Sequence, residues 1–109
     1  MLNRGLTEPL GAAALSELTE RSRRSRGHVL TATSLAGSGH PGGSFSSMEI
    51  YILLYSLARL RPEDPRWTDR DRIVVSHGHT SPGAYAALAE AGFFSADEFV
   101  AHFRQAGSV

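Results

Sequence analysis

The chain has 109 residues, of which 41% are apolar, enough for one small globular domain. Eleven basic residues balance eleven acidic ones, and this zero net charge argues against a nucleic-acid-binding module. Cysteine is absent and every basic side chain is arginine, which excludes disulfides, thiolate metal sites and lysine chemistry. No segment predicts a membrane span or a signal peptide, so we expect no membrane partner and a cytoplasmic location.

The first third of the chain predicts a loose arm followed by a long helix. Residues 1–11 contain one proline, two glycines and few apolar groups, which is typical of an N-terminal arm. From Ala12 to Leu35, apolar or small residues recur every three or four positions, which predicts an amphipathic helix. Four arginines on its flanks could bind phosphate, but a solvated helix face is the commoner origin of such a pattern: Arg21, Arg23, Arg24 and Arg26.

Residues 36–45, AGSGHPGGSF, combine four glycines and a proline with His40. Glycine permits left-handed backbone, and Pro41 disfavours helical geometry at His40, so we expect a rigid loop that holds one imidazole. A plain turn between two helices explains the composition equally well. The next residues, 46–49, have the pattern of a capping box opening a helix over 47–60, whose N-terminus would favour anions beside the loop.

The apolar content of that second helix predicts a fold that is incomplete on its own. Nine of the eleven residues at 50–60 are apolar and cover nearly every helix face, so chain outside this segment should bury them. After a charged loop, the β-branched run Ile73–Val75 predicts one buried strand, which has no partner here. The predicted class is therefore α/β, with helices and the first strand of a parallel sheet.

Two further helices are expected after this strand. One should begin near Pro82, a favourable first helical residue, and end near Ala91. A capping box at residues 95–98 predicts a short helix in which Phe99 and Phe103 lie one turn apart.

His77 and His79 follow the predicted strand at its carboxyl end, where ligands bind in open α/β sheets. Three interpretations remain open for them. A metal site would need further ligands, and a purely structural role would have the rings bond to loop backbone. The favoured interpretation is a site for a phosphorylated cofactor or substrate, on which His40 and His79 converge.

The motifs SGHPGG, DPRWTDRDRIVVSHGHTSPGAYAALAEAGFF and FRQAGS, in this order, resemble the beginning of transketolase. The resemblance runs from about Leu15 to Ser108, so residues 12–109 correspond to the N-terminal portion of the family's diphosphate-binding domain. The second half is also similar to the homodimeric decarboxylase component of 2-oxo-acid dehydrogenase complexes. SGHPGG favours transketolase.

The resemblance implies a thiamine diphosphate enzyme that transfers a two-carbon ketol unit between ketose and aldose sugar phosphates. His40 matches a catalytic histidine that contacts substrate and assists proton movement. His79 matches a catalytic histidine near the cofactor diphosphate and the substrate hydroxyls. Gly43 stands where some relatives have a cofactor-contacting serine, so its contact would be through the backbone, and the role of His77 is left open.

The resemblance also implies that much of the enzyme lies elsewhere. The GDG-type site for magnesium or calcium and the pyrimidine-binding part should belong to the remainder of the enzyme or to a separate chain, and no metal ligand is expected in this segment. We expect a fragment or split subunit, inactive alone, within a dimeric assembly. The alternative is a non-catalytic scaffold remnant.

Overall fold

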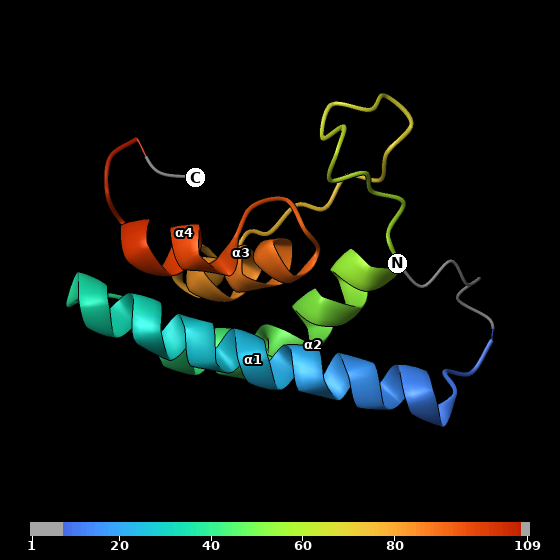
Figure 1. Ribbon diagram of the computed structural model, residues 1–109, viewed down its shortest axis with the longest axis horizontal. Helices are drawn as coiled ribbons and strands as arrows, with labels where there is room; N and C mark the ends of the chain where they lie inside the picture. Colours follow the sequence, from blue (N-terminus) through green and yellow to red (C-terminus); the bar gives the residue numbers. More distant parts are fainter. Residues whose placement is uncertain (1–7, 108–109) are drawn as a thin grey trace.

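The computed structural model describes residues 8–107, and within them it contains four α-helices, one short 3-10 helix and no strand (Figure 1). The predicted α/β class is therefore wrong for the described chain, which is all helical. Residues 1–7 of the predicted arm lie outside the described residues. The elements are α1 (Ala12–Ala36), α2 (Pro41–Leu57), η1 (Gly78–Thr80), α3 (Ser81–Glu90) and α4 (Ala96–His102).

The predicted strand at Ile73–Val75 is an unpaired extended segment. Val74 is 86% exposed, whereas Ile73 and Val75 are half-buried and Val75 packs against the core. An extended backbone alone places successive side chains on opposite sides, and β-branched residues favour an extended backbone. A strand also needs a neighbouring strand to accept its ladder hydrogen bonds, and the part of the chain that the structure describes supplies none.

Helix α1 is the long base on which the other helices pack, as Figure 1 shows, and it contacts α2, α3 and α4. Its bounds confirm the predicted amphipathic helix to within one residue. Val29 and Ala32 on its inner face are fully buried. The helix ends at Ala36 and is followed by Gly37, whose φ of +62° lets the chain change direction while its N–H donates to the Ser34 carbonyl at 3.1 Å.

Helix α2 begins at Pro41, six residues earlier than predicted, and ends at Leu57 instead of residue 60. The capping box at 46–49 is wrong, because Ser46 lies inside the helix and its hydroxyl donates to the Gly42 carbonyl at 3.1 Å. Proline at the first helical position needs no N–H acceptor, so it starts the helix despite the two glycines that follow. His40 thereby becomes the residue that immediately precedes α2.

Helices α2 and α3 approach closely through Gly83 and Ser44. A Cβ at Gly83 would lie 3.0 Å from the Ser44 Cβ, so only glycine permits this separation. The Gly83 N–H donates to the Ser44 hydroxyl at 3.0 Å, which satisfies a buried donor near the start of α3. Around this contact the core is formed by Met48, Tyr51, Ile52, Ala84, Ala86 and Ala87.

The predicted short helix after Ser95 is confirmed as α4. The Ser95 hydroxyl accepts from the Glu98 N–H at 3.1 Å and caps the helix. Phe99 and Phe103 are both buried, and their ring centroids lie 5.7 Å apart.

Arginines on α1 form ion pairs that connect it to the helices above. Arg24 pairs with Glu90 of α3 at 2.9 Å, and Arg26 pairs with Glu49 of α2 at 2.6 Å. The hydrogen bond from Arg26 holds the pKa of the Glu49 carboxyl below its usual value. Arg24 and Arg26 thus pair with carboxylates and link α1 to α3 and α2.

One face of α2 remains uncovered. Ile50, Leu53 and Leu54 are 60%, 37% and 43% exposed, whereas Tyr51 and Ile52 between them are buried. Thus the described chain covers only part of the strongly apolar residues 50–60. No helix in the described range has the length and apolar character needed to cross a membrane.

Candidate functional site

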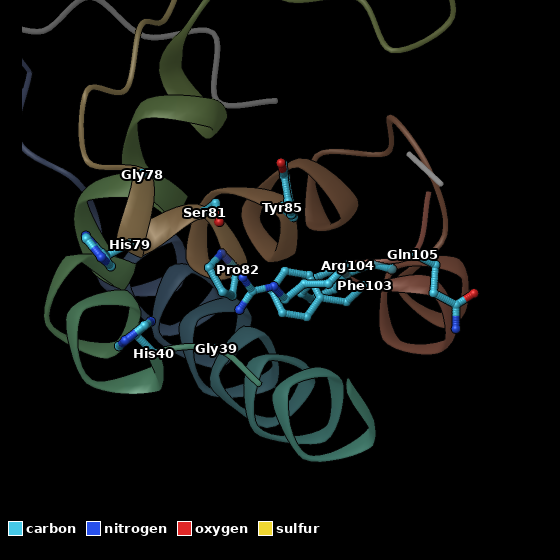
Figure 2. Close-up of a pocket in the computed structure, with 11 residues that line it drawn as sticks. Gly39, His40, Gly78, His79, Ser81, Pro82, Tyr85, Phe103, Arg104 and Gln105 are labelled. Atoms are coloured by element: carbon cyan, nitrogen blue, oxygen red, sulfur yellow. The ribbon is translucent and has the colours of Figure 1, made fainter. Parts of the chain in front are cut away.

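A cavity of about 460 Å³ opens where the loop before α2, the start of α3 and the end of α4 meet (Figure 2). Its volume is in the range of small-molecule binding pockets. Three separate parts of the sequence supply its walls. They include Gly39 and His40, Gly78 and His79, and Arg104 and Gln105.

His40 and His79 meet at one end of this cavity. Their ring centroids are 5.0 Å apart and the ring planes are nearly perpendicular, at 88°. Figure 2 shows the two imidazoles beside each other, away from Gln105. Both side chains are exposed, so a ligand in the cavity can reach them. The structure thus brings together the two histidines that the sequence analysis singled out.

His40 is positioned by the backbone on either side of it. Gly39 has a φ of +124°, and a Cβ there would lie 2.6 Å from the Thr33 methyl carbon and 3.3 Å from the Phe103 ring. Only glycine fits this site without displacing its neighbours. His40 itself has φ −125° and ψ 90°, as expected for a residue that precedes Pro41 and starts a helix.

His79 is positioned by a chain of hydrogen bonds around Thr80. The Thr80 hydroxyl donates to the His77 carbonyl at 2.8 Å. Because that hydroxyl has one proton, it accepts from the Tyr51 hydroxyl, 2.5 Å away. The Ser44 hydroxyl donates to the Thr80 carbonyl at 3.5 Å. Helix α2 thus fixes η1, the turn that carries His79, from within the core.

The other histidines lie outside the cavity lining. His77 is exposed and contributes its carbonyl to the turn, where it also accepts from the Thr80 N–H at 3.0 Å. His102 on α4 bonds to the Gln105 side chain at 3.1 Å, and His28 belongs to α1. Among the described residues, no group of three or more histidines and carboxylates could hold a metal ion.

Gly43 lies in the first turn of α2, beside Thr80. A Cβ at this position would lie 3.2 Å from the Thr80 methyl carbon, so the glycine allows η1 to pack closely against α2. It does not line the described cavity. Its expected backbone contact with a cofactor therefore stays a prediction.

Reasoning from individual residue types missed the far wall of the cavity. The Tyr85 ring packs edge-on against Phe99 and Phe103, with centroids 6.2 and 6.4 Å away, and the three rings form an aromatic wall. Arg104 and Gln105 also line the cavity at this end. The two phenylalanines one turn apart and the adjoining FRQ motif were the signals that could have located this wall.

The charges around the cavity favour an anionic ligand. The described residues that line it include an arginine and two histidines and no carboxylate. Helices α2 and α3 both begin beside it, and helix N-termini carry partial positive charge. The combination can bind a phosphate-bearing molecule whose remaining part lies against the aromatic wall.

Comparison with known proteins gives the chain its family. Residues 21–109 match the family described as "Transketolase, thiamine diphosphate binding domain". The human transketolase is 40% identical over 87 residues, which are 79% of this chain and 14% of the human protein. The transketolase of Treponema pallidum (strain Nichols) is 37% identical over 97 residues, which are 84% of this chain and 15% of that protein.

A further relative is described as a subunit. The 6-deoxy-6-sulfo-D-fructose transketolase subunit SqwG of Clostridium sp. (strain MSTE9) is 49% identical over 59 residues, 53% of this chain and 22% of that protein. The chain thus spans less than a quarter of the length of each of these relatives. Because the family match covers most of the chain, the protein belongs to the transketolase family, and its residues 21–109 correspond to the thiamine diphosphate binding domain.

Proposed function

We propose that this chain supplies the histidine-bearing wall of the active site of a thiamine diphosphate-dependent transketolase. The assembled enzyme would transfer a two-carbon ketol unit between ketose and aldose sugar phosphates. The observation that carries the proposal is the 5.0 Å approach of His40 and His79 in one cavity lined by donors. The transketolase relatives favour this reaction over that of the 2-oxo-acid decarboxylases.

The donor set fits one side of thiamine diphosphate. The N-terminus of α2 and the His79 imidazole can donate to diphosphate oxygens, while the absence of carboxylate from the described lining avoids repulsion. When bound, the cofactor supplies the carbanion chemistry of ketol transfer. The magnesium or calcium ion would be held by ligands outside the described residues, which contain no suitable cluster.

Within this site, the two histidines take different parts. His79, fixed through Thr80, would hydrogen-bond the diphosphate and the substrate hydroxyls. His40, on the loop before α2, would contact the substrate and move a proton to or from its oxygen. The two rings lie edge-on, with centroids 5.0 Å apart, so one bound ligand could contact both.

The remainder of the enzyme would complete the site, either in the same chain or as a separate subunit. The uncovered α2 face at Ile50, Leu53 and Leu54 supports this, because apolar side chains of this size gain free energy when another surface covers them. The description of SqwG as a subunit offers a precedent for a divided transketolase. The assembled unit would be a dimer and would act on anionic sugars.

The test begins with purification of the chain from its source under mild conditions, followed by mass analysis of what accompanies it. We expect a companion sequence carrying the GDG and pyrimidine-binding parts, and thiamine-dependent ketol transfer by the assembly. A chain that is monomeric, melts cooperatively alone and copurifies with nothing contradicts the proposal. It would favour the scaffold alternative.

In the active assembly, His40→Ala tests the proton-moving role. Turnover should fall by about 10²–10⁴-fold, the usual contribution of a general acid or base. Cofactor affinity should change little, because His79 and the N-terminus of α2 remain. Normal turnover at saturating cofactor, with cofactor affinity lost, would contradict this assignment.

A further inference from the structure

Among the described residues, His40 and His79 are the only two histidines whose rings lie in contact. Within residues 8–107, neither ring forms a hydrogen bond or an ion pair. Both side chains are exposed at one end of the cavity, where Figure 2 shows them beside each other. The ring nitrogens of both histidines are therefore open to a ligand, whereas the ring of His102 bonds to Gln105.

The separation of the two rings suits a single metal ion. Zinc binds imidazole nitrogens through bonds of about 2.0–2.1 Å in a tetrahedral shell, which places the centroids of two such rings about 5 Å apart. The centroids of His40 and His79 are already 5.0 Å apart. Because no hydrogen bond holds either ring, a rotation of each side chain can turn one nitrogen toward a shared ion.

The backbone holds the two imidazoles close together before any ion binds. Gly39 and Pro41 set the path of the chain on either side of His40. The buried Thr80 fixes the turn that carries His79. A pair of ligands that is already assembled loses little conformational entropy on binding. Once one imidazole has bound the ion, the other is present at a high effective concentration, so the pair can chelate.

The chemistry of the cavity selects the kind of ion. Its described lining contains no carboxylate, so water or an anion would complete the coordination shell, and Arg104 favours an anion. Magnesium and calcium prefer oxygen ligands and would gain little from two imidazoles. Zinc and copper accept nitrogen ligands, so the histidine pair favours a transition-metal ion.

We propose that His40 and His79 form an inhibitory zinc site while the cavity is free of cofactor and substrate. This ion differs from the magnesium or calcium ion of the cofactor, whose ligands we place outside the described residues. Zinc would occupy the ring nitrogens that the proposed function assigns to the diphosphate and the substrate. Ketol transfer would therefore stop until a chelator removes the ion. The inhibition rests on the proposed function, whereas the zinc binding does not.

The test titrates zinc into the assembled, cofactor-free enzyme by calorimetry, with magnesium in excess to fill sites built from oxygen ligands. His40→Ala and His79→Ala are compared with the unaltered enzyme and with the control His77→Ala, whose side chain is exposed outside the cavity. Electron paramagnetic resonance of the copper(II)-loaded enzyme counts the nitrogens bound to the ion. Ketol transfer is measured in unaltered enzyme that received zinc before the cofactor, and again after a zinc-selective chelator is added.

His40→Ala and His79→Ala should each weaken zinc binding by about tenfold or more, because a single imidazole cannot chelate. His77→Ala should bind zinc within about twofold of the unaltered enzyme. The copper spectrum of the unaltered enzyme should show two imidazole nitrogens. Zinc should abolish ketol transfer, and the chelator should restore it.

The site would be overturned by equal zinc binding in all four proteins, or by a loss with His77→Ala as large as that with His79→Ala. A copper spectrum with one bound nitrogen or none would also overturn it. An undiminished rate of transfer with zinc bound would overturn the inhibition. An unaltered assembly that binds zinc through both histidines but never transfers ketol units would contradict the proposed function and support the zinc site.

Discussion

The two histidines share one cavity but are positioned in different ways. His79 is on a turn whose Thr80 is buried and hydrogen-bonded to both Tyr51 and Ser44 in the core. His40 follows Gly39, where steric fit and left-handed backbone set the path of the chain. Hydrogen bonds of Thr80 therefore position His79. The position of His40 depends instead on close packing around Gly39, which leaves no room for a side chain there.

This difference predicts how strongly substitutions near each histidine should lower the stability of the protein. Loss of one hydroxyl from the hydrogen bonds around Thr80 leaves the other bonds of the turn in place and costs about 0.5–1.5 kcal/mol. At Gly39, in contrast, any larger residue adds a side chain to a crowded position with positive φ, so packed neighbours must move. Substitutions near His40 should accordingly cost more stability than substitutions of comparable size near His79.

The largest effect is expected from Gly39→Ala. The new methyl group would lie 2.6 Å from the Thr33 methyl carbon, in a backbone with φ +124°. The free energy of unfolding should fall by about 2–3 kcal/mol, with turnover reduced because His40 moves. Thermal melting and steady-state rates of the assembled enzyme measure both.

Gly37→Ala is the matched control for this substitution. Gly37 also has positive φ, +62°, but nothing lies within 4 Å of the Cβ it would acquire. Its cost should be about 1 kcal/mol, that of the left-handed backbone alone. Equal losses at both positions would show that packing around Gly39 does not set the path of the His40 loop.

An intermediate effect is expected from His79→Ala, because the buried bonds of Thr80 should preserve the turn while the imidazole is lost. Thiamine diphosphate binding should weaken by about 10- to 100-fold, the loss of one charge-assisted hydrogen bond. His77→Ala should do much less, since that side chain lies outside the cavity. Cofactor titration of both variants decides, and equal effects at 77 and 79 would contradict the assignment.

The smallest effect is expected from Tyr51→Phe, which removes the hydroxyl bonded to Thr80. The unfolding free energy should fall by about 1 kcal/mol, and cofactor affinity by no more than about fivefold. Tyr55→Phe, one turn further along α2, is the control outside this network. If Tyr51→Phe lowered the unfolding free energy as much as Gly39→Ala, the proposed difference in how the two histidines are positioned would be wrong.

The sequence predicted the helices because their signals are local. Spacing of apolar residues located α1 to within one residue, and the Ser95 cap located α4. Local signals failed at Ile73–Val75, because β-branched residues favour extended backbone without specifying a strand partner. They failed again at Pro41, where packing of Gly43 and Ser44 against the start of α3 overrides the low helix propensity of glycine.

For the site, the sequence located the residues with distinctive chemistry but not those brought in by tertiary packing. His40 and His79 were expected to converge, and they do, although a 3-10 turn and not a strand end carries His79. Their catalytic roles stay predictions. Arg104 could not be placed, because its position depends on the φ of one residue after α4 and on docking against Ser38.

The bond between Arg104 and Ser38 joins residues that are 66 positions apart, as does that between Arg24 and Glu90. Closing such a loop costs chain entropy. Residues from both ends of the loop line the cavity, so the cavity is complete only when α4 packs against α1. A ligand that touches both walls binds that closed arrangement alone. The binding free energy of such a ligand would therefore add to the free energy of unfolding, by about 2.7 kcal/mol at a hundredfold excess over Kd.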